Sequence, residues 1–178
     1  MMTRTQPRND QRAERIPSPE EIRGIRRVIG IDPGTQCGWA VLSNDGQRIA
    51  SGVWNLSPGR FEGSGMRFFR LGTYFETLIA GTQSETLVAY EEVRRHLGTD
   101  AAHIYGGVIA TITRLCETYA IPYKGIPVGT IKKTATGKGN ANKEAMMKAA
   151  EAHWGQWCAE DESDALFCAE TLRRELSA

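Results

Sequence analysis

The sequence lacks any apolar run near the roughly 18 residues that a membrane-spanning helix needs. Hydrophobic residues make up 40% of the chain and charged residues 24%, which is typical of globular domains that fold in water. We therefore expect no membrane helix. The first 27 residues also lack the apolar core of a secretory signal, and their four acids argue against a transit peptide, which is acid-poor. We expect a cytoplasmic protein.

Cysteine is scarce and widely spaced. The four cysteines are Cys37, Cys116, Cys158 and Cys168. No two of them form a CxxC pair, and none has a histidine partner at zinc-finger spacing, which argues against a zinc finger. We expect reduced thiols, as in cytosolic proteins.

The net charge of +1 conceals two segments of opposite sign. Residues 122–150 contain six lysines and one acid, whereas residues 151–178 contain seven acids and two arginines. A basic stretch beside an acidic one suits a site that holds phosphates next to metal-binding carboxylates. Solvated helix faces would produce the same pattern, so the charges alone leave both interpretations open.

The length of 178 residues suits one α/β domain with a well-buried core and is short for two. The first 27 residues contain seven arginines and almost no large apolar side chains. We interpret residues 1–24 as a flexible basic arm or a short frayed helix, and residues 25–178 as a single folded domain.

Apolar periodicity divides the domain into strands and helices. Strands are expected at residues 27–31, 38–42, 48–55, 86–90 and 121–126. Helices are expected at residues 68–79, 99–119, 141–154 and 161–176, with a polar, lysine-containing segment at 128–142. The order β-β-β-α-β-α-β-α-α favours an α/β protein with an RNase H-like fold, a five-stranded mixed sheet flanked by helices.

Four acids lie where strands end or a helix begins. Asp32 ends the first strand, Glu91 ends the fourth, and Asp161 and Asp164 fall in the first turn of the last helix. Two strand ends at one sheet edge can be adjacent, and residues three apart share a helix face, so the four carboxylates can converge. Mg²⁺ prefers oxygen ligands, and two such ions about 3.5–4 Å apart promote phosphodiester hydrolysis. The pattern therefore predicts a magnesium site.

Each acid also has a purely structural interpretation. Asp32 precedes Pro-Gly and suits a turn. Asp161 could cap the last helix, and Asp164 could be a first-turn acid that the helix dipole favours. Glu91 could be the polar end of a strand. The combination of the four, rather than any one of them, favours the metal site.

Three segments resemble motifs of the RuvC family of Holliday junction resolvases. Residues 29–40, IGIDPGTQCGWA, resemble its opening motif, in which Asp32 matches the first catalytic acid. YEEV at 90–93 resembles the second acidic motif and assigns that role to Glu91. DESDAL at 161–166 resembles the closing D-x-x-D-A-L motif, with Asp161 and Asp164 as its acids. The resemblance implies that the four acids are catalytic.

A fourth segment, TIKKTATGKGNANK at 130–143, resembles the basic loop before the penultimate helix of this family. By position, Lys132 and Lys143 match its DNA- and phosphate-contacting lysines. Lys132 or Lys143 would stabilise the developing charge, and we assign the catalytic role to Lys132. Lys133 and Lys138 would extend the same surface. Lysine neutralises backbone phosphates without reading bases, so this segment would provide affinity rather than sequence preference.

The region after the second acid departs from the family. Cellular resolvases carry an aromatic side chain there that is implicated in opening the junction, whereas this chain has Arg94, Arg95 and His96. We assign Arg94 and Arg95 to DNA binding and do not carry over the base-level preference of the family. The cluster and the arginine-rich arm look like the resolvase-like nucleases of phages and prophages, which implies a bacterial host cell.

The resemblance implies a structure-selective endodeoxyribonuclease. Such an enzyme nicks four-way junctions or other branched DNA symmetrically and leaves 5′-phosphate and 3′-hydroxyl ends. It would use two Mg²⁺ ions per site, with Mn²⁺ able to substitute, and no small-molecule cofactor. Symmetric cleavage needs two sites related by a two-fold axis, so we expect a homodimer. The helix at 101–119, with Gly106 and Gly107, is a candidate interface, although core packing explains the glycines equally well.

Three other functions stay open. Another RNase H-like nuclease would cut flaps, forks or RNA–DNA hybrids with the same acids. A junction-binding protein without nuclease activity would share the lysine surface. The GIDPGT segment at 30–35 also resembles the phosphate loop of actin-like sugar kinases and ATPases. Those proteins need a second similar domain, which a chain of this length is not expected to hold.

Overall fold

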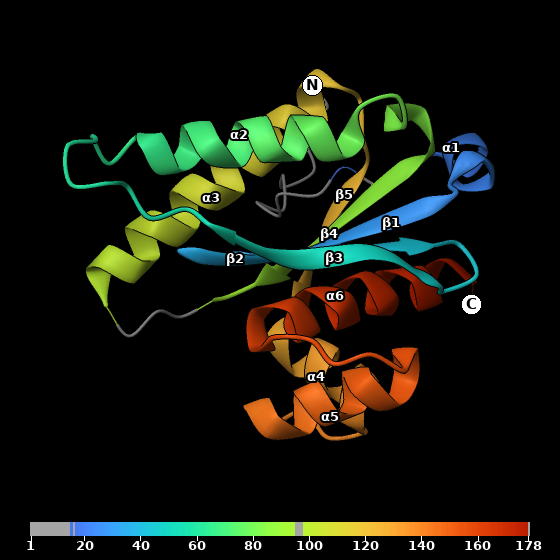
Figure 1. The fold of residues 1–178 in the computed structure, drawn as a ribbon. Helices are drawn as coiled ribbons and strands as arrows, with labels where there is room; N and C mark the ends of the chain where they lie inside the picture. Colours follow the sequence, from blue (N-terminus) through green and yellow to red (C-terminus); the bar gives the residue numbers. More distant parts are fainter. Residues whose placement is uncertain (1–14, 16, 95–97, 178) are drawn as a thin grey trace, which may run out of the picture.

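The computed structural model of the chain describes Arg15 and residues 17–94 and 98–177. It contains a five-stranded mixed sheet with helices on both faces (Figure 1). The predicted α/β architecture is therefore confirmed. Among the described residues, none of the helices combines the length and the apolarity that a membrane span requires. All four cysteines are free and buried.

The helices and strands follow one another in the predicted order, with three additions. The strands are β1 (Arg27–Asp32), β2 (Gln36–Ser43), β3 (Arg48–Asn55), β4 (Thr86–Glu92) and β5 (Tyr123–Pro127). The helices are α1 (Pro19–Gly24), α2 (Met66–Ile79), the 3₁₀ turn η1 (Gln83–Glu85), α3 (Thr99–Thr118), α4 (Val128–Thr136), α5 (Lys143–Trp154) and α6 (Glu160–Ser177). The additions are α1, η1 and α4.

The strand order β3-β2-β1-β4-β5 places β1 at the centre of the sheet. Strand β1 is antiparallel to β2 and parallel to β4, and Ile31 lies opposite Tyr90. The carboxyl ends of β1 and β4 therefore meet at one edge of the sheet. Asp32 and Glu91, the residues that follow this pair, lie side by side in the register.

The two faces of the sheet have separate cores, and the strand period of two assigns the acids to one of them. Ile29 and Ile31 of β1 belong to the cluster with α2 and α3, whereas Val28 belongs to the cluster with α4, α5 and α6. Because side chains alternate along a strand, Asp32 shares the face of Val28. The same alternation in β4 places Glu91 on the face of Leu87. Both acids therefore face the helices of that cluster, and Figure 1 shows α4, α5 and α6 together on one side of the sheet.

The backbone of helix α6 lies directly against the backbone of the sheet, and two glycines permit this close approach. A Cβ atom at Gly30 would lie 2.0 Å from the backbone oxygen of Ala165, and one at Gly38 would lie 1.9 Å from that of Asp161. Both separations are far below any real contact, so only glycine fits. The first turns of α6 are thereby held directly over the ends of β1 and β2.

The prediction for residues 128–142 was wrong, since α4 occupies most of what we expected to be an irregular polar segment. Only Ile131 of this helix is buried, and Pro127 precedes it without a side-chain cap. Too few apolar positions were present to produce a helical period. The helix ends at Gly137, whose φ of 78° is the left-handed conformation that glycine adopts readily.

The segment before β1 is a short helix rather than open coil where the structure describes it. Ser18 and Glu21 form a reciprocal capping box at the start of α1. Arg15 pairs with Tyr123 through two backbone hydrogen bonds of 3.0 Å, so the chain here borders the edge strand β5. A short helix was one of the two interpretations of residues 1–24, and the division of the chain at residue 24 stays a prediction.

Candidate metal centre

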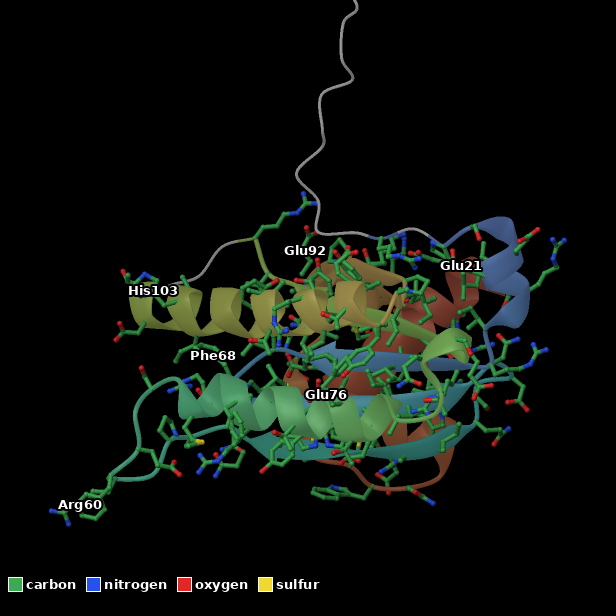
Figure 2. All side chains as sticks on the ribbon, turned by 90° about the horizontal axis from the view of Figure 1, so that it is seen from above. Glu21, Arg60, Phe68, Glu76, Glu92 and His103 are labelled. Carbon is green, nitrogen blue, oxygen red and sulfur yellow. The ribbon has the colours of Figure 1, made fainter. Side chains whose placement is uncertain are left out.

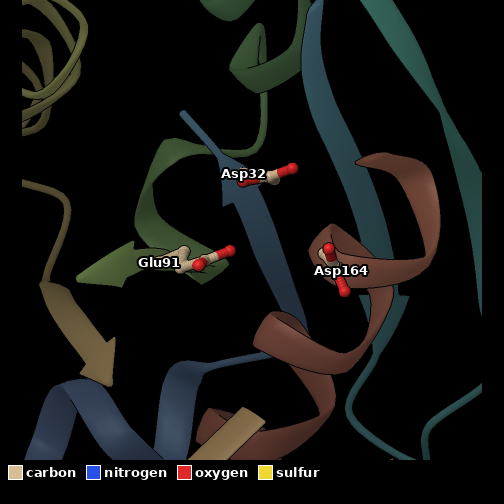
Figure 3. Close-up of side chains that lie close together, drawn as sticks. All are labelled: Asp32, Glu91 and Asp164. Atoms are coloured by element: carbon tan, nitrogen blue, oxygen red, sulfur yellow. The ribbon is translucent and has the colours of Figure 1, made fainter. Parts of the chain in front are cut away.

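Three carboxylates from three elements converge at the sheet edge. Asp32 comes from the end of β1, Glu91 from β4 and Asp164 from α6, and one ligand oxygen of each lies within 4.8 Å of the others. Figure 3 shows the three side chains turned toward a common centre. All three are half-buried. Three carboxylates this close repel one another strongly unless protons or a cation neutralise them.

The pKa values of the three acids record this crowding. Burial raises the pKa of Asp32 well above its usual value, and the charges of Glu91 and Asp164 raise it further. Burial and the charge of Glu91 raise the pKa of Asp164 to about 7. Burial raises the pKa of Glu91 as well, although a hydrogen bond from Asp32 and the charge of Lys132 oppose this. The hydrogen bond between the two side chains raises the pKa of Asp32 and opposes the rise in the pKa of Glu91.

The donor set fits a hard divalent cation. Oxygen Oδ1 of Asp164 is buried and accepts no hydrogen bond from any described residue. A buried carboxylate oxygen without a donor costs on the order of 1–3 kcal/mol or more, and a metal ion would remove that cost. All three ligands are carboxylate oxygens, the chemistry that Mg²⁺ and Mn²⁺ accept and that soft metals do not select.

Asp161 lies beside this group of three but outside it. It occupies the first turn of α6, one turn before Asp164, and its charge contributes to the raised pKa of Asp32 and of Asp164. Its own pKa is raised by burial and by the charge of Glu160 and lowered by Lys143. Because α6 starts at Glu160, Asp161 does not cap the helix. Its predicted part in the metal site stays a prediction.

Two of the predicted lysines border the acids. The charge of Lys132, in α4, lowers the pKa of both Glu91 and Asp164. Lys143, at the start of α5, forms an ion pair with Glu160, and the charges of Asp161 and Asp164 help to raise its pKa. The segment that we expected to be irregular therefore presents Lys132 to the site from a helix.

Three of the other four predicted DNA-binding residues lie at the surface. Lys133 and Lys138 are exposed in and after α4. Arg94, which is 67% exposed, forms an ion pair of 3.3 Å with Glu92. Arg95 falls outside the described residues. The structure thus leaves these four assignments as predictions.

Glu162 is a positioning residue that sequence reasoning missed. It is buried, accepts hydrogen bonds of 2.7 Å from Arg48 and from Ser51 of β3, and accepts a third of 3.1 Å from the backbone N–H of Ala159. Glu162 lies between Asp161 and Asp164 in the sequence, so these bonds attach the first turn of α6, with both acids, to the sheet. The sequence did carry a signal for this contact. Glu162 follows Ala159, the residue before α6, by three positions, and a glutamate at that position is the second half of a capping box.

Tyr105 of α3 holds the end of strand β4 in place. Its hydroxyl donates to the backbone oxygen of Glu91 at 3.1 Å and accepts from the backbone N–H of Val93 at 3.0 Å. The end of β4, which carries Glu91, is thus fastened to a helix on the opposite face of the sheet. A tyrosine in an amphipathic helix carries no sequence signal for such a contact.

Gly107 belongs to the core rather than to a surface that could meet a second chain. A Cβ atom there would lie 2.2 Å from the ring of Phe68, so the glycine lets α3 approach α2. Figure 2 shows Phe68 between these two helices. A Cβ atom at Gly106 would meet nothing within 4 Å. Of the two interpretations of this glycine pair, core packing therefore accounts for Gly107.

Comparison with known proteins points to the same family that the sequence motifs resemble. No protein-family model matches the sequence. The crossover junction endodeoxyribonuclease RuvC of Nitratidesulfovibrio vulgaris is 33% identical over 122 residues, which cover 66% of this chain and 70% of that protein. The protein of the same name from Pseudarthrobacter chlorophenolicus is 31% identical over 136 residues, which cover 68% of this chain and 65% of that protein.

Solved structures show the same fold. The structure of T. thermophilus RuvC in complex with a Holliday junction substrate superimposes with a TM-score of 0.73 at 21% identity, over 85% of this chain and 97% of that one. A second Thermus thermophilus RuvC structure gives a TM-score of 0.69. The predicted RNase H-like fold is therefore confirmed. Together with the identity to the curated relatives, this shows that the chain belongs to the RuvC family of crossover junction endodeoxyribonucleases.

Proposed function

We propose that this chain is a metal-dependent endodeoxyribonuclease that resolves Holliday junctions or closely related branched DNA. The observation that carries the proposal is the convergence of Asp32, Glu91 and Asp164 within 4.8 Å, with a buried oxygen of Asp164 left without a donor. A purely structural group of acids would be expected to be neutralised by arginine or lysine hydrogen bonds. This group is arranged instead to receive a cation.

We assign Mg²⁺, with Mn²⁺ as a substitute, to Asp32, Glu91 and Asp164, with Asp161 as a further ligand. Two such ions would activate a water for attack and would neutralise charge on the scissile phosphate. The protein residues hold the ligand oxygens at the sheet edge. Lys132 adds a positive charge next to Glu91 and Asp164, where it can stabilise the charge that develops on the phosphate. The products would be 5′-phosphate and 3′-hydroxyl ends.

The basic segment gives the DNA a place beside the acids. Lys132 and Lys143 lie next to the carboxylates, and the exposed Lys133 and Lys138 continue the positive surface. We propose that these lysines contact the phosphate backbone, together with Arg94 and Arg95. Such contacts give affinity and orientation without base preference. The choice of substrate then depends on the shape of the DNA.

Resolution of a four-way junction requires two opposed cuts, so we propose a homodimer with one metal centre in each subunit. The likeness of the fold to a RuvC bound to a Holliday junction supports the branched-DNA substrate. We also propose that residues 1–24 add a basic arm to the domain at 25–178 and that the protein works in the cytoplasm of a bacterial cell. Phage or prophage origin belongs to the same proposal.

The test is a cleavage assay with end-labelled four-way junctions, forks, flaps and RNA–DNA hybrids in Mg²⁺, with the wild type beside Asp32→Asn. We expect symmetric nicks in the junction from the wild type and retained binding without cleavage from Asp32→Asn, because the metal is lost while the lysine surface remains. Preference for flaps, forks or hybrids would favour another RNase H-like nuclease. Tight junction binding without cleavage by the wild type in Mg²⁺ and Mn²⁺ would indicate a non-catalytic junction-binding protein.

A further inference from the structure

One aromatic side chain is exposed at a place where the fold does not need it. Phe61 is 94% exposed, the highest value among the large hydrophobic side chains of the described residues. It lies in the loop between β3 and α2, next to Arg60, whose guanidinium lies 5.4 Å from the centre of the ring. In Figure 2, Arg60 lies at the outermost point of this loop, well beyond the body of the domain. We call Arg60 and Phe61 the loop tip.

The loop tip stands on a fixed base. Arg70 of α2 forms an ion pair of 2.7 Å with Glu62 and donates to the backbone oxygen of Ser57 at 2.6 Å. Glu62 also accepts a hydrogen bond from the backbone N–H of Gly59. These bonds join the two sides of the loop directly below its tip. The ring of Phe61 is therefore presented to solvent by a preorganised loop, which lowers the entropy cost of a contact with a partner.

The loop begins at the sheet edge that carries the acids. Asn55, the last residue of β3, lies opposite Gln36, and the backbone N–H of Leu56 donates to the oxygen of Thr35 at 2.8 Å. Thr35 follows Asp32 by three residues. Phe61 is the fifth residue after Leu56, so the tip reaches at most about 17 Å from this root. A DNA molecule at the acids can therefore extend to the loop tip.

The chemistry of the loop tip suits a nucleobase more than a protein. Residues 57–70 contain three arginines and one acid, so the loop and the start of α2 attract phosphate. A single ring beside an arginine is too small for a protein interface, which needs about 800 Å² from each partner. One aromatic ring is, however, enough to stack on one base, because every base has a π-face.

We propose that Phe61 stacks on an unpaired or unstacked base at the branch point of the DNA while Arg60 contacts the adjoining phosphate. This inference rests on the proposed function, since it names the contact by which the same site selects branched substrates. In a continuous duplex the bases cover one another, so stacking on one of them first requires unstacking. A branch point offers a base face without that cost. The contact therefore favours branched over linear DNA.

The test measures binding in the Asp32→Asn background, where the DNA is expected to stay uncut. Phe61→Ala should weaken four-way junction binding about 5- to 150-fold, the range reported by alanine substitution for base–aromatic stacking. Phe61→Trp should restore it, and binding to linear duplex should change less than about twofold under all variants. The fluorescence of 2-aminopurine placed at the branch point should be quenched by the protein with Phe61 and not by Phe61→Ala.

Phe69→Ala is the matched control, because Phe69 is also an exposed phenylalanine, 70% exposed, but lies on helix α2. An equal loss with Phe69→Ala would overturn the assignment to the loop tip, as would unchanged junction binding by Phe61→Ala. If the wild type cuts the junction and Phe61→Ala cuts and binds equally well, only this inference fails. A wild type that neither binds nor cuts the junction would overturn the proposed function and this inference together.

Discussion

The two halves of α6 hold buried acids in opposite ways. Near its start, Oδ1 of Asp164 has no hydrogen-bond donor among the described residues, and the pKa of Asp164 is raised to about 7. Two turns later, Glu170 accepts three hydrogen bonds of 2.6–2.9 Å from Arg173 and Arg174. Burial raises the pKa of Glu170, yet these bonds outweigh it and lower the pKa below its usual value.

The contrast separates an acid that belongs to the fold from one that we propose belongs to the chemistry. A buried carboxylate is tolerated in a stable protein when arginine or lysine neutralises it within the chain. Glu170 satisfies this condition with its own helix neighbours. Asp164, with Asp32 and Glu91 beside it, is not fully neutralised within the chain, and we propose that a bound cation completes the neutralisation. Substitutions of the two kinds of acid should therefore fail in different assays.

The largest effect should follow substitution of the acid that lacks a partner. We expect Asp164→Asn to lower junction cleavage roughly 1,000-fold or more, because a neutral amide cannot hold the cation that neutralises the phosphate. Junction binding should change little. Gel-based cleavage under single-turnover conditions, beside binding measured by fluorescence anisotropy, checks both. A variant that cuts at more than about a tenth of the wild-type rate would remove Asp164 from the metal site.

Substitution of the paired acid should affect stability instead. We expect Glu170→Gln to lower the free energy of unfolding by about 2 kcal/mol, with a Tm lower by about 4–8 °C, because two arginines lose a buried partner. Cleavage at 25 °C should stay within about twofold of the wild type. Calorimetry and urea titration check the stability change.

Glu175→Gln is the control for this variant, since Glu175 lies on the same helix and pairs with Lys124 at the exposed surface. The loss of an exposed pair should cost less than about 1 kcal/mol. Equal stabilities of Glu170→Gln and Glu175→Gln would contradict the contrast between the buried and the exposed acid.

The smallest effect should be a pH dependence of the free energy of unfolding, which bound metal should remove. The folded protein keeps the proton of Asp164 between the ordinary pKa of 3.8 and about 7, whereas the unfolded chain releases it near 3.8. The folded state thus binds more protons in this window, and the free energy of unfolding falls as the pH rises through it. We expect Mg²⁺ to raise the Tm about 2–4 °C more at about pH 8 than at about pH 5.5.

The Asp164→Asn variant should lose most of this difference, since it removes one of the protons and one of the ligands. Differential scanning calorimetry with Mg²⁺ and with a chelator at both pH values makes the comparison. A Mg²⁺ shift that is the same at both pH values would show that metal and protons do not compete for these carboxylates.

The centre of the site was predictable because local sequence determines it. Asp32 and Glu91 follow buried apolar strands, and strands of this kind place their ends at a common edge. The helix that carries Asp164 has its own apolar period. The sequence could not show how deeply each acid is buried, because burial depends on contacts between distant segments. The structure therefore brings three of the four predicted acids together and leaves Asp161 beside them.

The errors in the fold have physical causes of the same kind. Helix α4 contains threonines, a glycine and only one buried residue, Ile131, so tertiary contacts with α6 rather than local propensity stabilise it. Helix α1 was signalled by Ser18, Pro19 and Glu21, the capping-box pattern. The many arginines of that segment suited a basic arm equally well, so the sequence left the arm and the short helix as two open interpretations.

The contact between Gly38 and the backbone of Asp161 bears on which ions the site accepts. Main-chain atoms, rather than flexible side chains, set the separation between the acids on the strands and the acid on the helix. Ligands held in this way cannot spread to surround a larger ion. Ca²⁺ needs six to eight ligands in an adaptable shell, whereas Mg²⁺ needs a compact octahedron. We therefore expect the proposed metal centre to prefer small divalent ions, and we expect this preference to depend on a glycine that would touch no ion.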